Sequence, residues 1–157
     1  MKNLAAISLG SNPDRASEDP VQSDSLPPFG RHLEPARLVS QRLRRRLEAA
    51  GLSCGEGAPG KPFGWYFVAT ANGKRFVVAV CPDQIPLPHT SMTITAQPFV
   101  GFKDRLFRKR RLAVENQNWT CLQPDFTHAV NAEFSDYHPR WMTFNEWFET
   151  IDHEQRA

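Results

Sequence analysis

The sequence predicts an α+β fold, with a three- to four-stranded antiparallel sheet and one N-terminal and one or two C-terminal helices packed on it. Three observations predict it: a segment with helical spacing over residues 35–50, two strand-like runs joined by Asn-Gly, and a helix-capping signature near the C-terminus. The chain has 157 residues, of which 40% are hydrophobic. That size and composition are typical of one domain with one core, which we expect over residues 29–157.

The N-terminal part has a different composition. Residues 11–28 are mostly Ser, Asp, Pro, Glu and Gln, with Val21 and Leu26 as the larger aliphatic residues. Such a segment buries too little apolar surface to offset the entropy cost of ordering, so we expect a disordered lead over residues 1–28. The apolar run over residues 4–9 is shorter than the core of a secretory signal. Three widely spaced cysteines indicate reduced thiols, and we expect a cytoplasmic protein without a membrane segment.

Residues 35–50 predict the first helix. Apolar residues recur there at steps of three and four, which places them on one helix face. Pro35 suits a first helical turn, and Gly51 suits a left-handed C-cap. The opposite face is basic, so we expect it to be exposed. The inward residues are Ala36, Val39, Leu43, Leu47 and Ala50, and the outward ones are Arg37, Arg42, Arg44 and Arg45.

A β-hairpin follows. Residues 65–70 and 75–81 are rich in aromatic and β-branched residues and flank Asn72-Gly73, a strong two-residue turn signal. The second strand is apolar on both faces, which predicts a central position. A third strand is expected over residues 91–97, with one face in the core and Thr93, Thr95 and Gln97 toward water. We expect Phe67 or Trp65, but not both, to face inward.

The C-terminal third predicts one or two helices. Residues 99–119 fit neither period cleanly, so an edge strand, a short helix or both stay open. Pro124 suits the first turn of a helix that ends before His138-Pro139. Thr143 and Glu146 form a capping box for a final helix, which we expect to cover the sheet together with the helix over residues 35–50. Its predicted buried face is Phe144, Trp147, Phe148 and Ile151, and the predicted core is Val39, Leu43, Leu47, Phe67, Phe76, Val78, Val80, Phe144 and Trp147.

Signatures of catalysis are scarce. The five histidines do not stand at the spacings from cysteine or one another that mark zinc sites. The glycine-rich stretch before Lys61 lacks the spacing of a phosphate-binding loop, and Pro62 replaces its hydroxyl residue. Asp136 and His138 resemble an acid beside an acid/base, but a polar connector between helices explains them better. We expect no catalytic residue, cofactor or metal; an enzyme with a site assembled from dispersed residues stays an alternative.

Charge is unevenly distributed along the chain. Net charge is −2 over residues 1–30, +10 over residues 31–111 and −6 over residues 112–157, which together make +2. The basic and acidic blocks either neutralise each other in the fold or leave a charged surface for a partner. Within the basic block, residues 103–111 hold six basic side chains in nine, interleaved with Phe107.

That basic segment predicts a binding surface. A protein partner is the leading hypothesis, because catalytic signatures are missing beside a segregated charge. Nucleic acid is the alternative, since basic residues neutralise phosphates while an aromatic ring stacks on a base. Trp65 begins three successive aromatic residues that suit either a core or a protein interface. The candidate binding residues are Arg105, Arg108, Lys109, Arg110, Arg111, Arg42, Arg45 and Trp65.

The order of elements resembles small uncharacterised bacterial proteins of the immunity-protein type. The resemblance covers residues 31–111 and consists of a helix, a Gly-Trp-Tyr-Phe strand, an Asn-Gly turn, an Arg-Phe-Val-Val-Ala-Val strand, a third strand and a basic Arg-Leu-Phe-Arg-Lys-Arg segment. It implies a non-enzymatic protein that binds or blocks a protein partner, and it carries no catalytic motif. The proline-rich loop and the tail after Arg111 depart from it.

Overall fold

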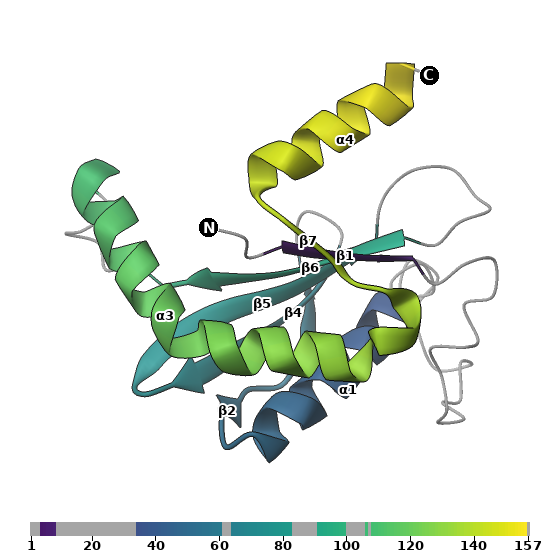
Figure 1. Cartoon of the computed structure of the whole chain (residues 1–157). Helices are drawn as coiled ribbons and strands as arrows, with labels where there is room; N and C mark the ends of the chain where they lie inside the picture. The colour runs from purple at the N-terminus through teal and green to yellow at the C-terminus, as the bar shows by residue number, and fades with distance from the viewer. Residues whose placement is uncertain are drawn as a thin grey trace.

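The computed structural model describes residues 4–8, 34–60, 64–82, 91–99, 106 and 108–156. These residues form an α+β fold in which a seven-stranded antiparallel sheet is accompanied by three helices (Figure 1). The sheet has more strands than the three or four predicted. In chain order the elements are β1 (Leu4–Ser8), α1 (Glu34–Ala49), β2 (Ser53–Cys54), β3 (Ala58–Gly60), β4 (Gly64–Ala71), β5 (Lys74–Pro82), β6 (Ser91–Pro98), α3 (Arg108–Glu133), the 3-10 helix η4 (Ser135–Tyr137), β7 (Arg140–Met142) and α4 (Phe144–Arg156).

Helix α1 confirms the first predicted helix. Glu34 in its first turn and Arg46 in its last turn complement the helix dipole. The helix ends as expected, because Gly51 has a φ of 94° and the Leu52 N–H donates to the Leu47 carbonyl at 3.1 Å. Of its predicted inward residues, Ala36, Val39, Leu43 and Leu47 are fully enclosed, whereas Ala50 follows the helix and is exposed.

The β4–β5 hairpin is also confirmed. Asn72 and Gly73 have φ values of 50° and 73°, which a two-residue hairpin turn of this kind requires. One expectation is wrong: Trp65 and Phe67 both point to the helix-covered face. Side chains alternate along a strand, so residues two apart share a face. Phe67 is buried and Trp65 packs half-buried against the same core.

The sheet order is β2-β4-β5-β6-β1-β7, with β3 also pairing with β4. Strand β1 lies between β6 and β7 and is antiparallel to both. The lead predicted over residues 1–28 is therefore wrong for Leu4–Ser8, which supply buried apolar residues and complete ladders on both sides. Residues 9–33, including most of that lead, lie outside the described part of the chain.

Strand β6 confirms the third predicted strand but not its water-facing side. Thr93 and Thr95 are only 4% and 9% exposed, whereas Gln97 is exposed as expected. The reason is the position of β6 between β5 and β1, where Thr95 stands beside Leu4 and Ala79 on one face. Both of these neighbours are buried as well. An alternating pattern indicates a solvated face only where that face is uncovered.

Helix α3 corrects the predicted start near Pro124. It begins at Arg108 and runs for 26 residues, with Pro124 in its interior. Proline cannot donate to the carbonyl four residues before it and crowds that turn, which bends a helix. Figure 1 shows the bend: the C-terminal part of α3 lies along the sheet, and the first turns rise away from it. Phe126 in the C-terminal part and Phe134, which directly follows the helix, are completely buried.

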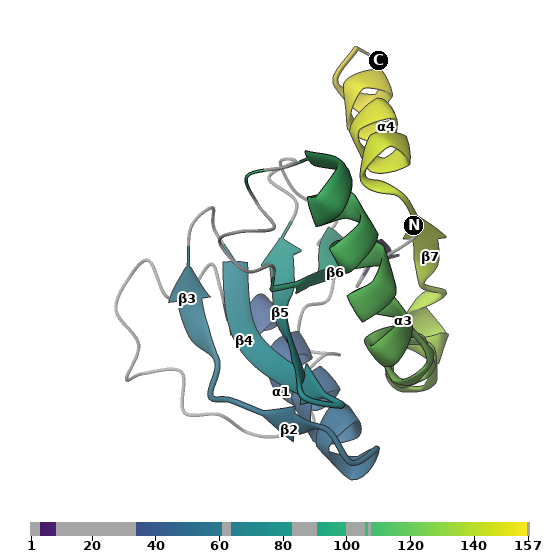
Figure 2. The ribbon, with the colours of Figure 1, turned by 90° about the vertical axis from the view of Figure 1, so that its left-hand side faces the viewer.

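Helix α4 begins with the predicted capping box. The Thr143 N–H donates to Glu146 Oε2 at 2.6 Å, and the Glu146 N–H donates to Thr143 Oγ1 at 3.2 Å. The prediction that α4 covers the sheet is wrong, since it projects from the edge at β7 (Figures 1 and 2). Phe144 and Trp147 are half-buried and Phe148 is 60% exposed, while the side chain of Ile151 lies outside the described part.

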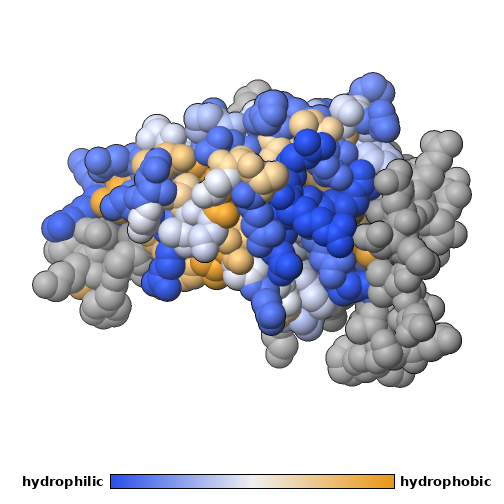
Figure 3. Space-filling view, turned by 90° about the horizontal axis from the view of Figure 1, so that it is seen from below, coloured by the Kyte–Doolittle hydropathy of each residue, from blue (hydrophilic) through white to orange (hydrophobic). Residues whose placement is uncertain are grey.

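The core lies between one face of the sheet and two helices. Both α1 and the C-terminal part of α3 lie on that face. Helix α4 and the first turns of α3 rise on the other side of the sheet (Figures 1 and 2). The predicted core residues on α1, β4 and β5 are confirmed; α3 supplies the side chains that were expected from α4. Seen from the helix side, the outer surface carries a hydrophilic band with apolar residues interspersed (Figure 3).

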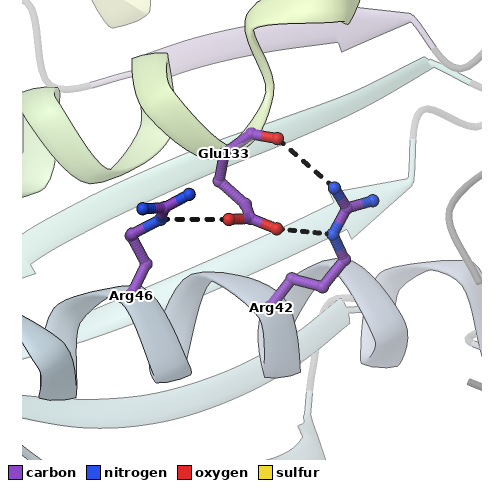
Figure 4. Close-up of polar contacts among 3 residues, drawn as sticks. All are labelled: Arg42, Arg46 and Glu133. Carbon is purple, nitrogen blue, oxygen red and sulfur yellow. Dashed lines mark hydrogen bonds and ion pairs between the residues drawn. The ribbon is translucent and has the colours of Figure 1, made fainter. Parts of the chain in front are cut away.

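An ion-pair network joins α1 to the end of α3. Glu133 accepts from Arg42 Nε at 2.7 Å with one carboxylate oxygen and from Arg46 Nε at 3.1 Å with the other (Figure 4). Arg42 also donates to the Glu133 carbonyl and lies over the Phe134 ring, 5.4 Å from its centre. Part of the basic block is thus neutralised by the acidic C-terminal block. None of the helices in the described residues has the length and apolarity needed to cross a membrane.

Glu133→Gln tests this network. The variant keeps the side-chain shape but removes the charge shared by two arginines, so we expect unfolding to become easier by about 1 kcal/mol, as for a partly buried network. Urea denaturation measures the change. Glu115→Gln is the matched control, because Glu115 meets a single exposed arginine, Arg111, at 3.7 Å, and its loss should be clearly smaller. Equal losses would contradict the assignment.

Candidate functional site

The first turns of α3 form a projecting basic surface. Lys109, Arg110 and Arg111 are exposed there, beside two leucines that are also exposed: Leu106 at 64% and Leu112 at 44%. We call Leu106 and residues 108–112 the basic arm. Figure 2 shows that this part of α3 rises clear of the sheet. The arm therefore presents positive charge and apolar surface together.

Helix stability does not explain the basic residues of the arm. The N-terminal end of a helix is the positive end of its dipole, so cations there are unfavourable and anions favourable. The first turn of α3 has four successive basic residues from Arg108 and no acidic residue. Arg111 pairs with Glu115 one turn later, at 3.7 Å and with almost half of the Arg111 side chain exposed. The charge of the side chains and the dipole thus add up to an electropositive end that suits an anionic partner.

The structure brings together only part of the predicted binding set. Lys109, Arg110 and Arg111 share the basic arm; Arg108 begins the helix, and its side chain, like Arg105 as a whole, lies outside the described part. Arg42 and Arg45 stand on α1, and Arg42 binds Glu133 at the other end of α3. That end lies about 20 residues beyond the arm on a helix of 26 residues, on the order of 30 Å along the helix. The α1 arginines are therefore not part of the same surface.

Trp65 is not an exposed anchor. It lies on β4 on the helix-covered face and packs half-buried against the core. Its ring also lies directly against Gly57, where an added Cβ would stand 2.1 Å from the Trp65 Nε1 atom. The chain between β2 and β3 thus covers the indole. Glycine is required at this position because the backbone approaches the ring so closely.

Helix α4 is a second projecting surface, which the sequence analysis assigned to the core. Phe148 is 60% exposed, and its ring contacts that of Trp147 edge-to-face with centroids 5.0 Å apart. The helix carries four acidic residues and one arginine, a net charge of −3. An amphipathic pattern predicts an apolar face but does not specify what covers it. No local signal distinguishes a helix that packs on its own sheet from one that projects.

The face of the sheet opposite α1 holds a polar pair that the sequence analysis missed. The Tyr66 hydroxyl lies 3.9 Å from Cys81 Sγ, and Thr93 Oγ1 donates to the Cys81 carbonyl at 3.4 Å. Desolvation raises the pKa of Tyr66 to about 12, with further contributions from the charge of Cys81 and the hydrogen bond between them. The hydroxyl is therefore protonated at neutral pH. The sequence does hold a signal for this pair. The two-residue Asn72-Gly73 turn sets a register in which residues 66 and 81 are diagonal neighbours on adjacent strands.

Two glycines make room for this pair. A Cβ on Gly60 would stand 2.6 Å from the Tyr66 ring, and one on Gly64 would stand 2.7 Å from Cys81 Sγ and 3.1 Å from the Val80 carbonyl oxygen. The ring thus lies over backbone that only glycine supplies. This arrangement holds the phenol and the thiol in one position on the sheet.

The remaining titratable groups are dispersed. Asp136 and His138 are both exposed, in η4 and at its left-handed C-cap, which matches a connector between helices. His128 lines a surface hollow whose described walls come from α3 alone, between Gln123 and Ala132. Burial, together with the charge of Glu48 and against that of Arg44, raises the pKa of Cys54 to about 11. Among the described residues no three His, Cys, Asp or Glu side chains gather where a metal ion would fit.

Gly64→Ala tests the glycine support beneath Tyr66 and Cys81. The added methyl group meets a sulfur atom and a backbone carbonyl, so we expect a loss of roughly 1–3 kcal/mol in the free energy of unfolding, as for overpacking. Gly55→Ala is the matched control, since the nearest atom to its Cβ is the Val68 carbonyl oxygen at an ordinary 3.7 Å. Thermal unfolding of both variants measures the difference. A Gly64→Ala variant as stable as Gly55→Ala would refute the packing argument.

Titration of Tyr66 tests its environment. The chain has two tyrosines, and absorbance of phenolate near alkaline pH should show one of them ionising at about pH 12; Tyr66→Phe should remove that step. Because folding raises this pKa above the unfolded value, the stabilising effect is complete below about pH 10 and is lost as pH rises toward 12. Cys81→Ser should lower the Tyr66 pKa. An unchanged titration in Tyr66→Phe would contradict the assignment.

Comparison with known proteins identifies no relative. No family model matches the chain, and neither the curated proteins nor the solved structures contain a significant match. The function is therefore argued from the geometry of the two projecting surfaces, the basic arm and α4.

Proposed function

We propose that this protein acts without catalysis by binding an acidic surface of another protein through its basic arm, in the manner of an inhibitor or immunity protein. One observation carries the proposal: successive exposed basic residues stand at the positive end of a projecting helix. Evolutionary pressure for stability would favour acidic residues there. Basic residues at this position lower the stability of the helix end and increase its attraction for anions.

The apolar residues of the arm favour a protein partner. Leu106 and Leu112 are large exposed hydrophobic residues beside the charges. Protein interfaces combine a desolvated apolar centre with a polar rim. Exposed leucine side chains contribute little to the binding of phosphate groups. The net charge of the chain is only +2, whereas nucleic-acid-binding domains are usually more basic.

Nucleic acid is the second candidate for the same surface. The specific observation is the density of positive charge, since every residue from Arg108 to Arg111 is basic and the helix dipole adds to it. Binding through phosphates alone would fall steeply with salt. Replacing the two leucines would not change the affinity of such binding.

The double variant Lys109→Gln/Arg110→Gln tests the arm. We expect capture of the protein partner from a cytosolic extract treated with nuclease to weaken by at least about tenfold, because interface charges contribute to steering and to contact. Quantitative mass spectrometry of the captured protein measures it. Lys74→Gln/Arg75→Gln is the matched control, with two exposed cations on β5, and should bind as the unmodified chain does.

Three outcomes separate the candidates. A protein that survives nuclease and is lost with Leu106→Ser/Leu112→Ser supports the proposal. Nucleic acid that washes off with salt, and ignores the leucine variant, supports the second candidate. Capture that is unchanged when Arg108, Lys109, Arg110 and Arg111 are all replaced by glutamine would overturn both.

A further inference from the structure

We propose that the basic arm also recognises a second copy of this chain, whose α4 supplies the acidic and aromatic surface. The inference rests on the proposed function, because the same arm does the binding, and it names a specific acidic partner. Each copy has one basic arm and one α4, so two copies related by a two-fold axis make the contact twice.

Charge complementarity is the first argument. The arm has four successive basic residues, whereas α4 has a net charge of −3. Glu149 is exposed, and Asp152 follows one helical turn later. Complementary potentials select and orient such partners, whereas pairing of α4 with α4, or of arm with arm, would oppose like charges. The pairing of arm with α4 is therefore favoured over either symmetric alternative.

Apolar surface is the second argument. Phe148 is 60% exposed on α4, and Leu106 and Leu112 are 64% and 44% exposed on the arm. These are three of the four large hydrophobic residues described as exposed. A stable interface needs a desolvated apolar centre, which charges alone do not provide. Here the aromatic ring on α4 and the two leucines on the arm would form that centre. Both charge and apolar surface thus match between the two elements.

The position of the two elements is the third argument. Both rise on the side of the sheet opposite α1, from different ends of the molecule (Figures 1 and 2). α4 leaves from the edge at β7, and the arm is the start of α3, whose C-terminal part lies along the core face. Because they point away from the body at separate ends, α4 of one copy meets the arm of another without rearrangement of either core.

A charge-reversal pair tests the inference on the full chain. The arm variant is Lys109→Glu/Arg110→Glu, and the α4 variant is Glu149→Lys/Asp152→Lys; Glu146 is kept because it caps α4. Sedimentation velocity over a range of concentrations should show a monomer–dimer equilibrium for the unmodified chain that shifts toward monomer at high salt. Each variant alone should dimerise at least about tenfold more weakly, because the altered arm has no net positive charge and the altered α4 is no longer acidic, so neither contact keeps its attraction. An equal mixture should recover dimers, since one contact then joins an unmodified arm to an unmodified α4 and the other sets the introduced glutamates against the introduced lysines.

The controls make the result decisive. Lys74→Glu/Arg75→Glu changes the same amount of charge away from both surfaces and should dimerise like the unmodified chain; circular dichroism confirms that all variants are folded. A chain that stays monomeric at every concentration overturns this inference and leaves the capture experiment on a different protein unaffected. A dimer that ignores the reversals, or that is not restored in the mixture, also overturns it, as does open-ended polymer in place of a closed dimer.

Discussion

The register of the β4–β5 hairpin is the constraint on which the rest of the structure depends. Asn72 and Gly73 adopt the left-handed conformations of a tight turn, and this sets which residues share a face. Phe76 and Val78 then point with Phe67 toward the helices, and the opposite face receives Tyr66. A shift by one residue would reverse both faces at once. The apolar layer for α1 and α3, and the polar pair on the other side, have this common origin.

The two parts of helix α3 have different surroundings: the C-terminal part is buried in the core, and the first turns are exposed. Its C-terminal part fills the core with Leu122 and Phe126, and Glu133 ties its end to two arginines of α1. Beyond the bend at Pro124, the first turns of the same helix stand clear of the sheet. A surface carried on a helix anchored in this way is presented with little loss of entropy on binding.

The opposing charge blocks are used in two ways. At Glu133 the acidic end of the chain neutralises arginines of the basic middle within the fold. The charges of the basic arm and of α4, which are opposite in sign, stand instead on two projecting helices beside exposed apolar residues. Internal neutralisation, one of the two hypotheses drawn from the sequence, is found at Glu133, whereas a charged binding surface stays a proposal for the basic arm and α4. The binding proposals concern only the charge outside the core.

The sequence alone determined the local elements: α1 with its Gly51 cap, the Asn72-Gly73 hairpin and the Thr143 capping box, because each depends on residues adjacent along the chain. It did not determine which elements meet. Leu4–Ser8 became a central strand, and α3 took the place on the sheet expected for α4, since long-range pairing and coverage depend on contacts that no local period records. The candidate site divides likewise: the density of basic residues is visible in the sequence, but the exposure of the basic arm and of Phe148 was decided only by tertiary packing.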